Sequence, residues 1–134
     1  VLLLLDVDRF ALVNDAHGPS VGDELLCALA RRLQALPGPA ATPMRLGEDE
    51  FALLAEADDA PAAAQALAAA VREALATPLA VAGQAFHIDV SMGIALYPDT
   101  AADPERLLRA ANAAMHAAKR VPGTAEQLAE ERFE

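Results

Sequence analysis

The chain opens with an apolar run at residues 1–5 and then reaches two carboxylates, Asp6 and Asp8. A run without polar alternation is typical of a strand that is buried on both faces, so its sheet must be covered on both sides. Open α/β sheets tend to hold ligands at the carboxyl ends of their strands. The sequence therefore predicts a central strand over residues 1–6, with two acidic groups at the end where a ligand is expected.

A second acidic cluster lies in residues 44–54, where two apolar arms flank Gly47 and three consecutive carboxylates, Glu48, Asp49 and Glu50. We expect a hairpin with strands over residues 43–46 and 50–55, in which Gly47 supplies the positive φ of a tight turn. Three adjacent anions repel one another, so they need water, a cation or a function. A solvated acidic tip is one interpretation. If the hairpin pairs beside the first strand, Asp6 and Asp49 converge on a divalent cation such as Mg²⁺.

The remaining pattern predicts four helices and a second hairpin. The helices are expected over residues 10–15, 20–36, 58–76 and 103–119, with Ser20 as N-cap of the second and Asp103 as N-cap of the fourth. The second hairpin joins residues 79–81 to a long strand over residues 86–96, in which one face is apolar, the other is partly polar, and Gly93 permits close approach of a backbone or ligand. This order indicates an α+β fold of ferredoxin-like or palm type, with a central, mostly antiparallel sheet flanked by helices.

Composition narrows the class of protein. The 134 residues are 54% hydrophobic and 22% charged, which indicates one globular domain with a substantial core. The net charge of −10 argues against a nucleic-acid surface but allows a nucleotide whose charge Mg²⁺ balances. Cys27 is the only cysteine, so no internal disulfide or thiolate metal cluster forms. No apolar run approaches the roughly 20 residues of a membrane span. We expect a cytoplasmic domain of a longer protein, without membrane contact.

Five stretches together resemble a known family. Residues 47–51, Gly-Glu-Asp-Glu-Phe preceded by Arg45, resemble the GGDEF signature of diguanylate cyclases. Further matches fall in that family's order at residues 6–10, 14–23, 90–95 and 110–119. The resemblance implies the palm-like domain that the family shares with adenylyl cyclases. It gives a GGDEF-like domain over residues 1–123 and leaves residues 124–134 as a helix-compatible tail or the start of an interdomain linker.

The resemblance also implies a reaction, the condensation of two GTP into cyclic di-GMP, with one GTP held by each of two facing domains. Asp6, Asp49 and the Val7 carbonyl would bind Mg²⁺ or Mn²⁺. Asp49 and Glu50 would be the catalytic carboxylates, with Asp49 helping to activate the ribose 3′-hydroxyl.

The implied nucleotide contacts come from both ends of the domain. Asn14 and Asp23 would read the guanine edge, since an amide both donates and accepts and a carboxylate accepts from guanine N–H groups. The phosphates would meet Lys119 and the backbone N–H groups around Asp8, Arg9 and Phe10. Gly47 would lie against the nucleotide.

Several residues depart from the family pattern. Glu48 replaces the second glycine of the signature, where its carboxylate would crowd the nucleotide and repel phosphate by roughly 1 kcal/mol. Ala11 replaces a lysine, and residues 122–124 replace the Gly-Arg-Asn that usually follows Lys119, so two phosphate-side cations are missing. Residues 38–41 lack the Arg-x-x-Asp of the family's inhibitory product site. The resemblance therefore implies lost or weak cyclase activity.

Three functions stay open. We favour a degenerate GGDEF domain that binds GTP and acts as a regulatory or dimerising module, with a homodimer and a C-terminal EAL domain as partners suggested by family analogy. The second is an active diguanylate cyclase, because Asp6, Asp49, Asn14, Asp23 and Lys119 all remain. The third is a structural interaction domain that binds no nucleotide.

Overall fold

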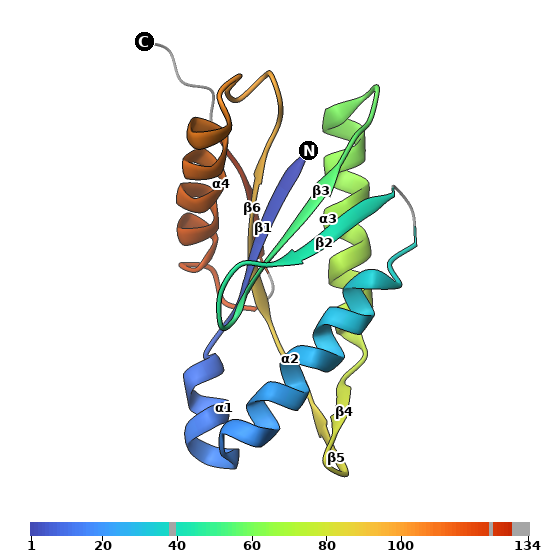
Figure 1. Cartoon of the computed structure of the whole chain (residues 1–134), viewed down its shortest axis with the longest axis vertical. Helices are drawn as coiled ribbons and strands as arrows, with labels where there is room; N and C mark the ends of the chain where they lie inside the picture. The colour runs from blue at the N-terminus through green and yellow to red at the C-terminus, as the bar shows by residue number, and fades with distance from the viewer. Residues whose placement is uncertain (38–39, 124, 130–134) are drawn as a thin grey trace.

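A computed structural model describes residues 1–37, 40–123 and 125–129. Its main sheet has five strands in the order β2-β3-β1-β6-β7, with α4 on one face and α2 and α3 on the other (Figure 1). The strands are β1 (Leu2–Val7), β2 (Ala41–Arg45), β3 (Glu50–Ala55), β6 (Val90–Ala95) and β7 (Ala125–Leu128). β1 lies between β3 and β6 and is antiparallel to both, while β6 and β7 are parallel. This confirms the predicted α+β fold with a mostly antiparallel sheet.

The central strand is buried on both faces, as the opening apolar run predicted. Leu3 and Leu5 point into the larger core, which α1, α2 and α3 cover, while Leu2 and Leu4 pack with Met115 beneath α4. All six residues of β1 are buried. The strand therefore holds its carboxyl end, where the acidic residues lie, in a fixed position.

Gly93 in β6 lets α4 pack directly on the sheet. A Cβ at this position would lie 2.0 Å from the carbonyl oxygen of Ala111 and 2.3 Å from the backbone nitrogen of Met115. The close approach that the sequence predicted at Gly93 is therefore confirmed, and the approaching group is the backbone of a helix.

The four helices are α1 (Phe10–His17), α2 (Pro19–Gln34), α3 (Ala60–Ala76) and α4 (Pro104–Ala118). Asp103 caps α4 as predicted, accepting a 3.1 Å hydrogen bond from the backbone N–H of Arg106. The prediction that Ser20 caps α2 was wrong, because Gly18 is the N-cap and Pro19 opens the helix. Proline suits the first turn because its φ is already helical and it has no N–H to satisfy. None of the helices in the described part of the chain is long and apolar enough to span a bilayer.

The long strand predicted over residues 86–96 is two strands. β5 (Gln84–Phe86) pairs with β4 (Leu79–Val81) in a separate two-stranded sheet, and the chain then joins the main sheet as β6. All six residues of β6 are buried, so the predicted half-polar face is absent from it. The local alternation was misleading because α4 covers one face of β6 and the larger core covers the other.

The C-terminal stretch is also different from the prediction. Ala125–Leu128, expected to be helix-compatible, forms β7 along the free edge of β6, with Ser91 opposite Ala125. Pairing with a sheet edge satisfies backbone groups and overrides the local preference for a helix. Thr124 and residues 130–134 of the predicted tail lie outside the described residues, as do Gly38 and Pro39 of the product-site position.

Candidate metal and nucleotide site

The signature hairpin lies against the carboxyl end of β1 (Figure 1). In the β1–β3 register Asp6 stands opposite Glu50, and the backbone N–H of Val7 donates a 3.0 Å hydrogen bond to the carbonyl of Asp49. Strand pairing therefore brings together two acidic segments that are more than forty positions apart in the sequence.

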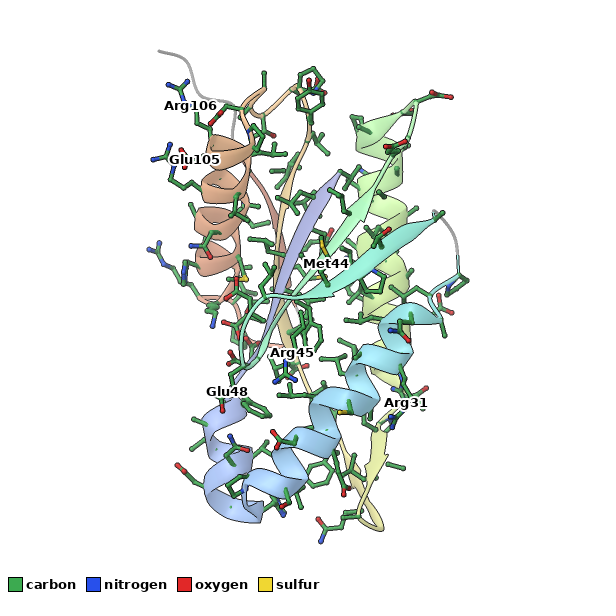
Figure 2. The ribbon with its side chains drawn as sticks, viewed as in Figure 1. Arg31, Met44, Arg45, Glu48, Glu105 and Arg106 are labelled. Carbon is green, nitrogen blue, oxygen red and sulfur yellow. The ribbon has the colours of Figure 1, made fainter. Side chains whose placement is uncertain are left out.

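Arg45 holds the turn of this hairpin. Its guanidinium donates to the carbonyl oxygens of Gly47 at 3.0 Å and Glu48 at 2.8 Å. The side chains of Arg45 and Glu48 both lie near the hairpin tip (Figure 2). The prediction of a positive φ at Gly47 was wrong, since Gly18, Gly83 and Gly123 are the glycines with positive φ in the described part of the chain. The turn is longer than a two-residue loop, so side-chain bonds to its carbonyls replace left-handed backbone geometry.

Asp6 and Asp49 share one site with a single lysine. Asp6 is 9% exposed, and one of its oxygens lies 2.5 Å from the Lys119 ammonium. Its other oxygen, Oδ1, is buried and has no hydrogen-bond partner in the described part of the chain. Burial raises the pKa of Asp49, and the charge and hydrogen bond of Asp6 raise it further, although its own backbone and Lys119 oppose the shift. Two carboxylates thus share one lysine, so negative charge is in excess at the pair.

Lys119 follows the last residue of α4 and faces three carboxylates. Burial alone would lower the pKa of Lys119, but the hydrogen bond and charge of Asp6, with the charges of Asp8 and Asp49, raise it above 10.5. The ammonium is therefore a permanent cation at neutral pH, and it is already paired with Asp6.

Asp8 is fixed from the neighbouring strand. Its backbone N–H donates to the carbonyl of Asp89 at 2.9 Å, and its carboxylate accepts a 2.7 Å hydrogen bond from the Ser91 hydroxyl. Burial raises the pKa of Asp8, while Ser91 and Lys119 lower it. Sequence reasoning did not assign Ser91 a site role, although a lone hydroxyl within the apolar run of residues 90–95 was a usable signal, because a buried hydroxyl needs a partner.

The residues expected to read guanine lie on two adjacent helices, Asn14 on α1 and Asp23 on α2. Asn14 packs against Gly22, where a Cβ would lie 1.8 Å from its Oδ1. That oxygen is buried without a hydrogen-bond partner in the described part of the chain, and Asp23 is exposed. Gly22 has no side chain, so the Asn14 amide can lie directly against the backbone of α2 next to Asp23.

A cavity of about 480 Å³ adjoins the carboxylates. Asp8, Arg9 and Lys119 line it, together with Leu12 and the 121–123 segment that follows α4. Phe10, the next predicted contact, buries its ring in the larger core, so its backbone alone is available to a ligand.

Asp6 and Asp49 fit a magnesium site in which the ion would also bind the phosphate oxygens of a nucleotide. No three histidine, cysteine, aspartate or glutamate side chains are grouped to bind a metal within the described residues. Mg²⁺ needs fewer protein ligands, because it takes one or two carboxylates and completes its shell with water and phosphate oxygens. The unpartnered Oδ1 of Asp6 beside Asp49 is the kind of donor such an ion would bind.

Comparison with known proteins gives the family. A family model described as "Diguanylate cyclase, GGDEF domain" matches residues 1–124. The chain is 41% identical over 118 residues to the bifunctional diguanylate cyclase/cyclic di-GMP phosphodiesterase MucR of Pseudomonas aeruginosa, covering 88% of this chain and 17% of MucR. It is 35% identical over 130 residues to the diguanylate cyclase TpbB of the same species, covering 96% of this chain and 30% of TpbB.

The fold agrees with this match. The crystal structure of the TpbB GGDEF domain superposes with a TM-score of 0.91 at 34% identity, covering 98% of this chain and 82% of that one. The chain thus spans less than a third of the length of these curated relatives. On the family model, the relatives and the fold together, this chain belongs to the GGDEF domain family of cyclic di-GMP signalling.

Proposed function

We propose that this domain binds GTP with Mg²⁺ or Mn²⁺ at the carboxyl end of β1 and serves as a regulatory module with weak or no cyclase activity. The observation that carries this is the pairing of Asp6 with Asp49, because two carboxylates meet there around one lysine and leave a buried oxygen that has no hydrogen-bond partner among the described residues. Such a site is short of positive charge until a metal ion binds, and the bound ion can then accept the phosphate oxygens of a nucleotide.

Asp6, Asp49 and the Val7 carbonyl would hold the ion, which would act as a Lewis acid toward the phosphates when bound. Asp49 would also help to activate the ribose 3′-hydroxyl. Glu50, which stands opposite Asp6 in the strand register, is the second catalytic carboxylate. Lys119 supplies a fixed positive charge beside them.

Asn14 and Asp23 select guanine. The unpartnered Asn14 amide oxygen and the exposed Asp23 carboxylate lie on neighbouring helices, α1 and α2. Together they offer a donor and acceptors to a base edge. Gly47 at the hairpin tip would present its backbone alone to the nucleotide.

Glu48 limits turnover in this proposal. Arg45 fixes its backbone carbonyl, and its side chain is exposed at the hairpin tip. Its φ is not positive, so the turn accepts glutamate without backbone strain. The effect is therefore one of charge and bulk toward a triphosphate, roughly 1 kcal/mol or more of repulsion.

The test is turnover by the domain fused to a dimeric coiled coil, so that dilution of monomers cannot explain silence. With GTP and Mg²⁺ we expect little cyclic di-GMP or linear intermediate from the wild type, and more from Glu48→Gly. Glu48→Gln separates charge from bulk. Glu105→Gln removes a carboxylate near the far end of α4 and is the matched control (Figure 2). Strong wild-type turnover, or an inert Glu48→Gly variant beside an active GGDEF control, would contradict the role of Glu48.

The second candidate, an active cyclase, is favoured by the survival of Asp6, Asp49 and Lys119 in one cluster. Wild-type product that Asp49→Ala abolishes would establish it. A purely structural domain would instead show no thermal stabilisation by millimolar Mg²⁺ and GTP, because a ligand of the native state must stabilise it.

The setting of the domain belongs to the same proposal. Because the chain spans 17% of MucR, a bifunctional protein, a C-terminal EAL phosphodiesterase domain is the partner we propose in the full-length protein. A homodimer would bring two GTP sites face to face, and a domain that uses GTP would work in the cytoplasm.

A further inference from the structure

Arg9, between β1 and α1, has a backbone that favours glycine. Its φ of 56° and ψ of 32° lie in the left-handed region, and its side chain makes no capping hydrogen bond to α1. Glycine adopts this conformation with less strain than residues with a Cβ. A strained non-glycine residue beside a candidate site is reason to look for a function of its side chain.

The Arg9 guanidinium is also free. Within the described part of the chain no hydrogen bond or ion pair involves it, although Asp8, its neighbour in the chain, lines the same cavity. Ser91 holds the carboxylate of Asp8, and Asp6 already pairs with Lys119. Among the described residues, Arg9 is therefore a cation without an intramolecular partner.

Arg9 lines the cavity of about 480 Å³ together with Lys119 and Gly123. Two cations, Arg9 and Lys119, face two carboxylates, Asp8 and Asp89, across its lining. Without Arg9 the balance would be negative and would repel a polyphosphate. Gly123 offers no side chain on its part of the wall, and the His87 imidazole lies 3.8 Å from the Asp89 carboxylate, so Arg9 is the lining residue that can add positive charge for a phosphate.

We propose that the Arg9 side chain is a phosphate-binding group of this domain, which holds the polyphosphate of a nucleoside triphosphate in the cavity beside Lys119. The planar guanidinium can bind two phosphate oxygens at once. This rests on the proposed GTP binding and adds to it a residue that determines affinity for the polyphosphate.

The test compares Arg9→Gly and Arg9→Lys by titration calorimetry with GTP, guanosine and inorganic tripolyphosphate, each with Mg²⁺. Glycine relaxes the left-handed backbone, so loss of binding in this variant cannot be attributed to misfolding, and its Tm should not fall. We expect Arg9→Gly to weaken GTP and tripolyphosphate binding about tenfold or more and to leave guanosine unchanged. Arg9→Lys should recover part of the loss. Arg106→Ala, in the first turn of α4, is the matched control (Figure 2).

The outcomes separate this inference from the proposed function. Equal GTP affinity in the wild type and Arg9→Gly would overturn the role of Arg9 and keep the GTP site. Tripolyphosphate binding that depends on Arg9, without GTP binding, would keep the role of Arg9 and refute the proposed function. A wild type that binds neither ligand would overturn both.

Discussion

The Ser91 hydroxyl in β6 donates a 2.7 Å hydrogen bond to the carboxylate of Asp8, at the end of β1. Ser91 is completely buried, whereas Asp8 lines the cavity beside Lys119. The bond thus connects the interior of the sheet to the first residue of the loop that carries Arg9. It also opposes the effect of burial, which raises the pKa of Asp8.

Replacing Ser91 with alanine should destabilise the domain by about 1–2 kcal/mol at pH 7, because the partly buried carboxylate loses its donor. In the folded protein the pKa of Asp8 is already raised above 3.8, so ionised Asp8 disfavours the folded state. The free energy of unfolding therefore increases as pH falls through the folded pKa toward 3.8. Ser91→Ala raises this pKa further. Ser91→Ala should therefore lower the free energy of unfolding more at pH 7 than near pH 4, as measured by urea unfolding.

Thr100→Val is the matched control for Ser91→Ala. The buried Thr100 hydroxyl accepts a 3.0 Å hydrogen bond from the backbone N–H of Leu96, and no carboxylate is involved. Its cost should be the same at both pH values. An equal cost of Ser91→Ala at pH 7 and pH 4 would show that the hydroxyl does not stabilise an ionised Asp8.

Asp49→Asn should stabilise the metal-free protein. Burial and the charge of Asp6 raise the pKa of Asp49, so ionised Asp49 disfavours the fold at neutral pH, and stability rises as pH falls through the folded pKa toward 3.8. The amide removes this repulsion. We expect a gain of about 0.5–1 kcal/mol, or roughly 1–4 °C in Tm, measured by thermal unfolding in EDTA.

The same substitution should abolish stabilisation by Mg²⁺ and GTP, so the variant gains stability and loses its ligand. Asp58→Asn, an exposed acid at the entry to α3, should change neither property. A fall in the Tm of metal-free Asp49→Asn would mean that the ionised carboxylate is held by favourable contacts and not strained by Asp6.

Lys119→Gln should destabilise the protein by about 1–3 kcal/mol in EDTA, because it leaves the largely buried Asp6 carboxylate without a cation. The raised pKa of Lys119 means that its contribution is complete below pH 10.5 and is lost only as pH rises through the folded pKa. Chemical unfolding at pH 7 measures the full effect. Arg109→Gln in α4 is the control.

If Asp6 and Asp49 bind the ion, Mg²⁺ should recover more stability in Lys119→Gln than in the wild type, since it replaces the missing charge. A Mg²⁺ response equal in both proteins would argue that the ion binds elsewhere.

Local sequence predicted the parts of the fold that local physics decides. The unbroken apolar run before Asp6 required a strand covered on both faces, and Asp103 followed by Pro104 marked the start of α4, as observed. The meeting of Asp6 and Asp49 followed once the hairpin was placed beside that strand.

The errors at β6 and β7 came from contacts distant in the sequence. Burial of Ser91 depends on α4 and the larger core, and β7 depends on the free edge of β6. Alternation over residues 86–91 could not reveal the break between two sheets. The turn at Gly47 depends on the side chain of Arg45, which no backbone preference of glycine could indicate.

Gly22→Ala tests whether Asn14 reads the base. Alanine normally favours a helix interior over glycine by about 1 kcal/mol, but a Cβ here would lie 1.8 Å from Asn14 Oδ1 and 3.1 Å from the Phe10 ring. The flexible end of Asn14 has to move. The stability gained from alanine in the helix and the stability lost by displacing Asn14 should nearly cancel, leaving the free energy of unfolding within about 1 kcal/mol of the wild type.

The preference for GTP over ATP should instead fall about tenfold, because a displaced amide no longer meets the guanine edge. Competition binding with the two nucleotides measures this ratio directly, and Ser20→Ala, an exposed change in the same helix, should leave it unchanged. An unaltered ratio in a folded Gly22→Ala protein would assign base selection to Asp23 alone, because the new Cβ cannot coexist with the present position of Asn14.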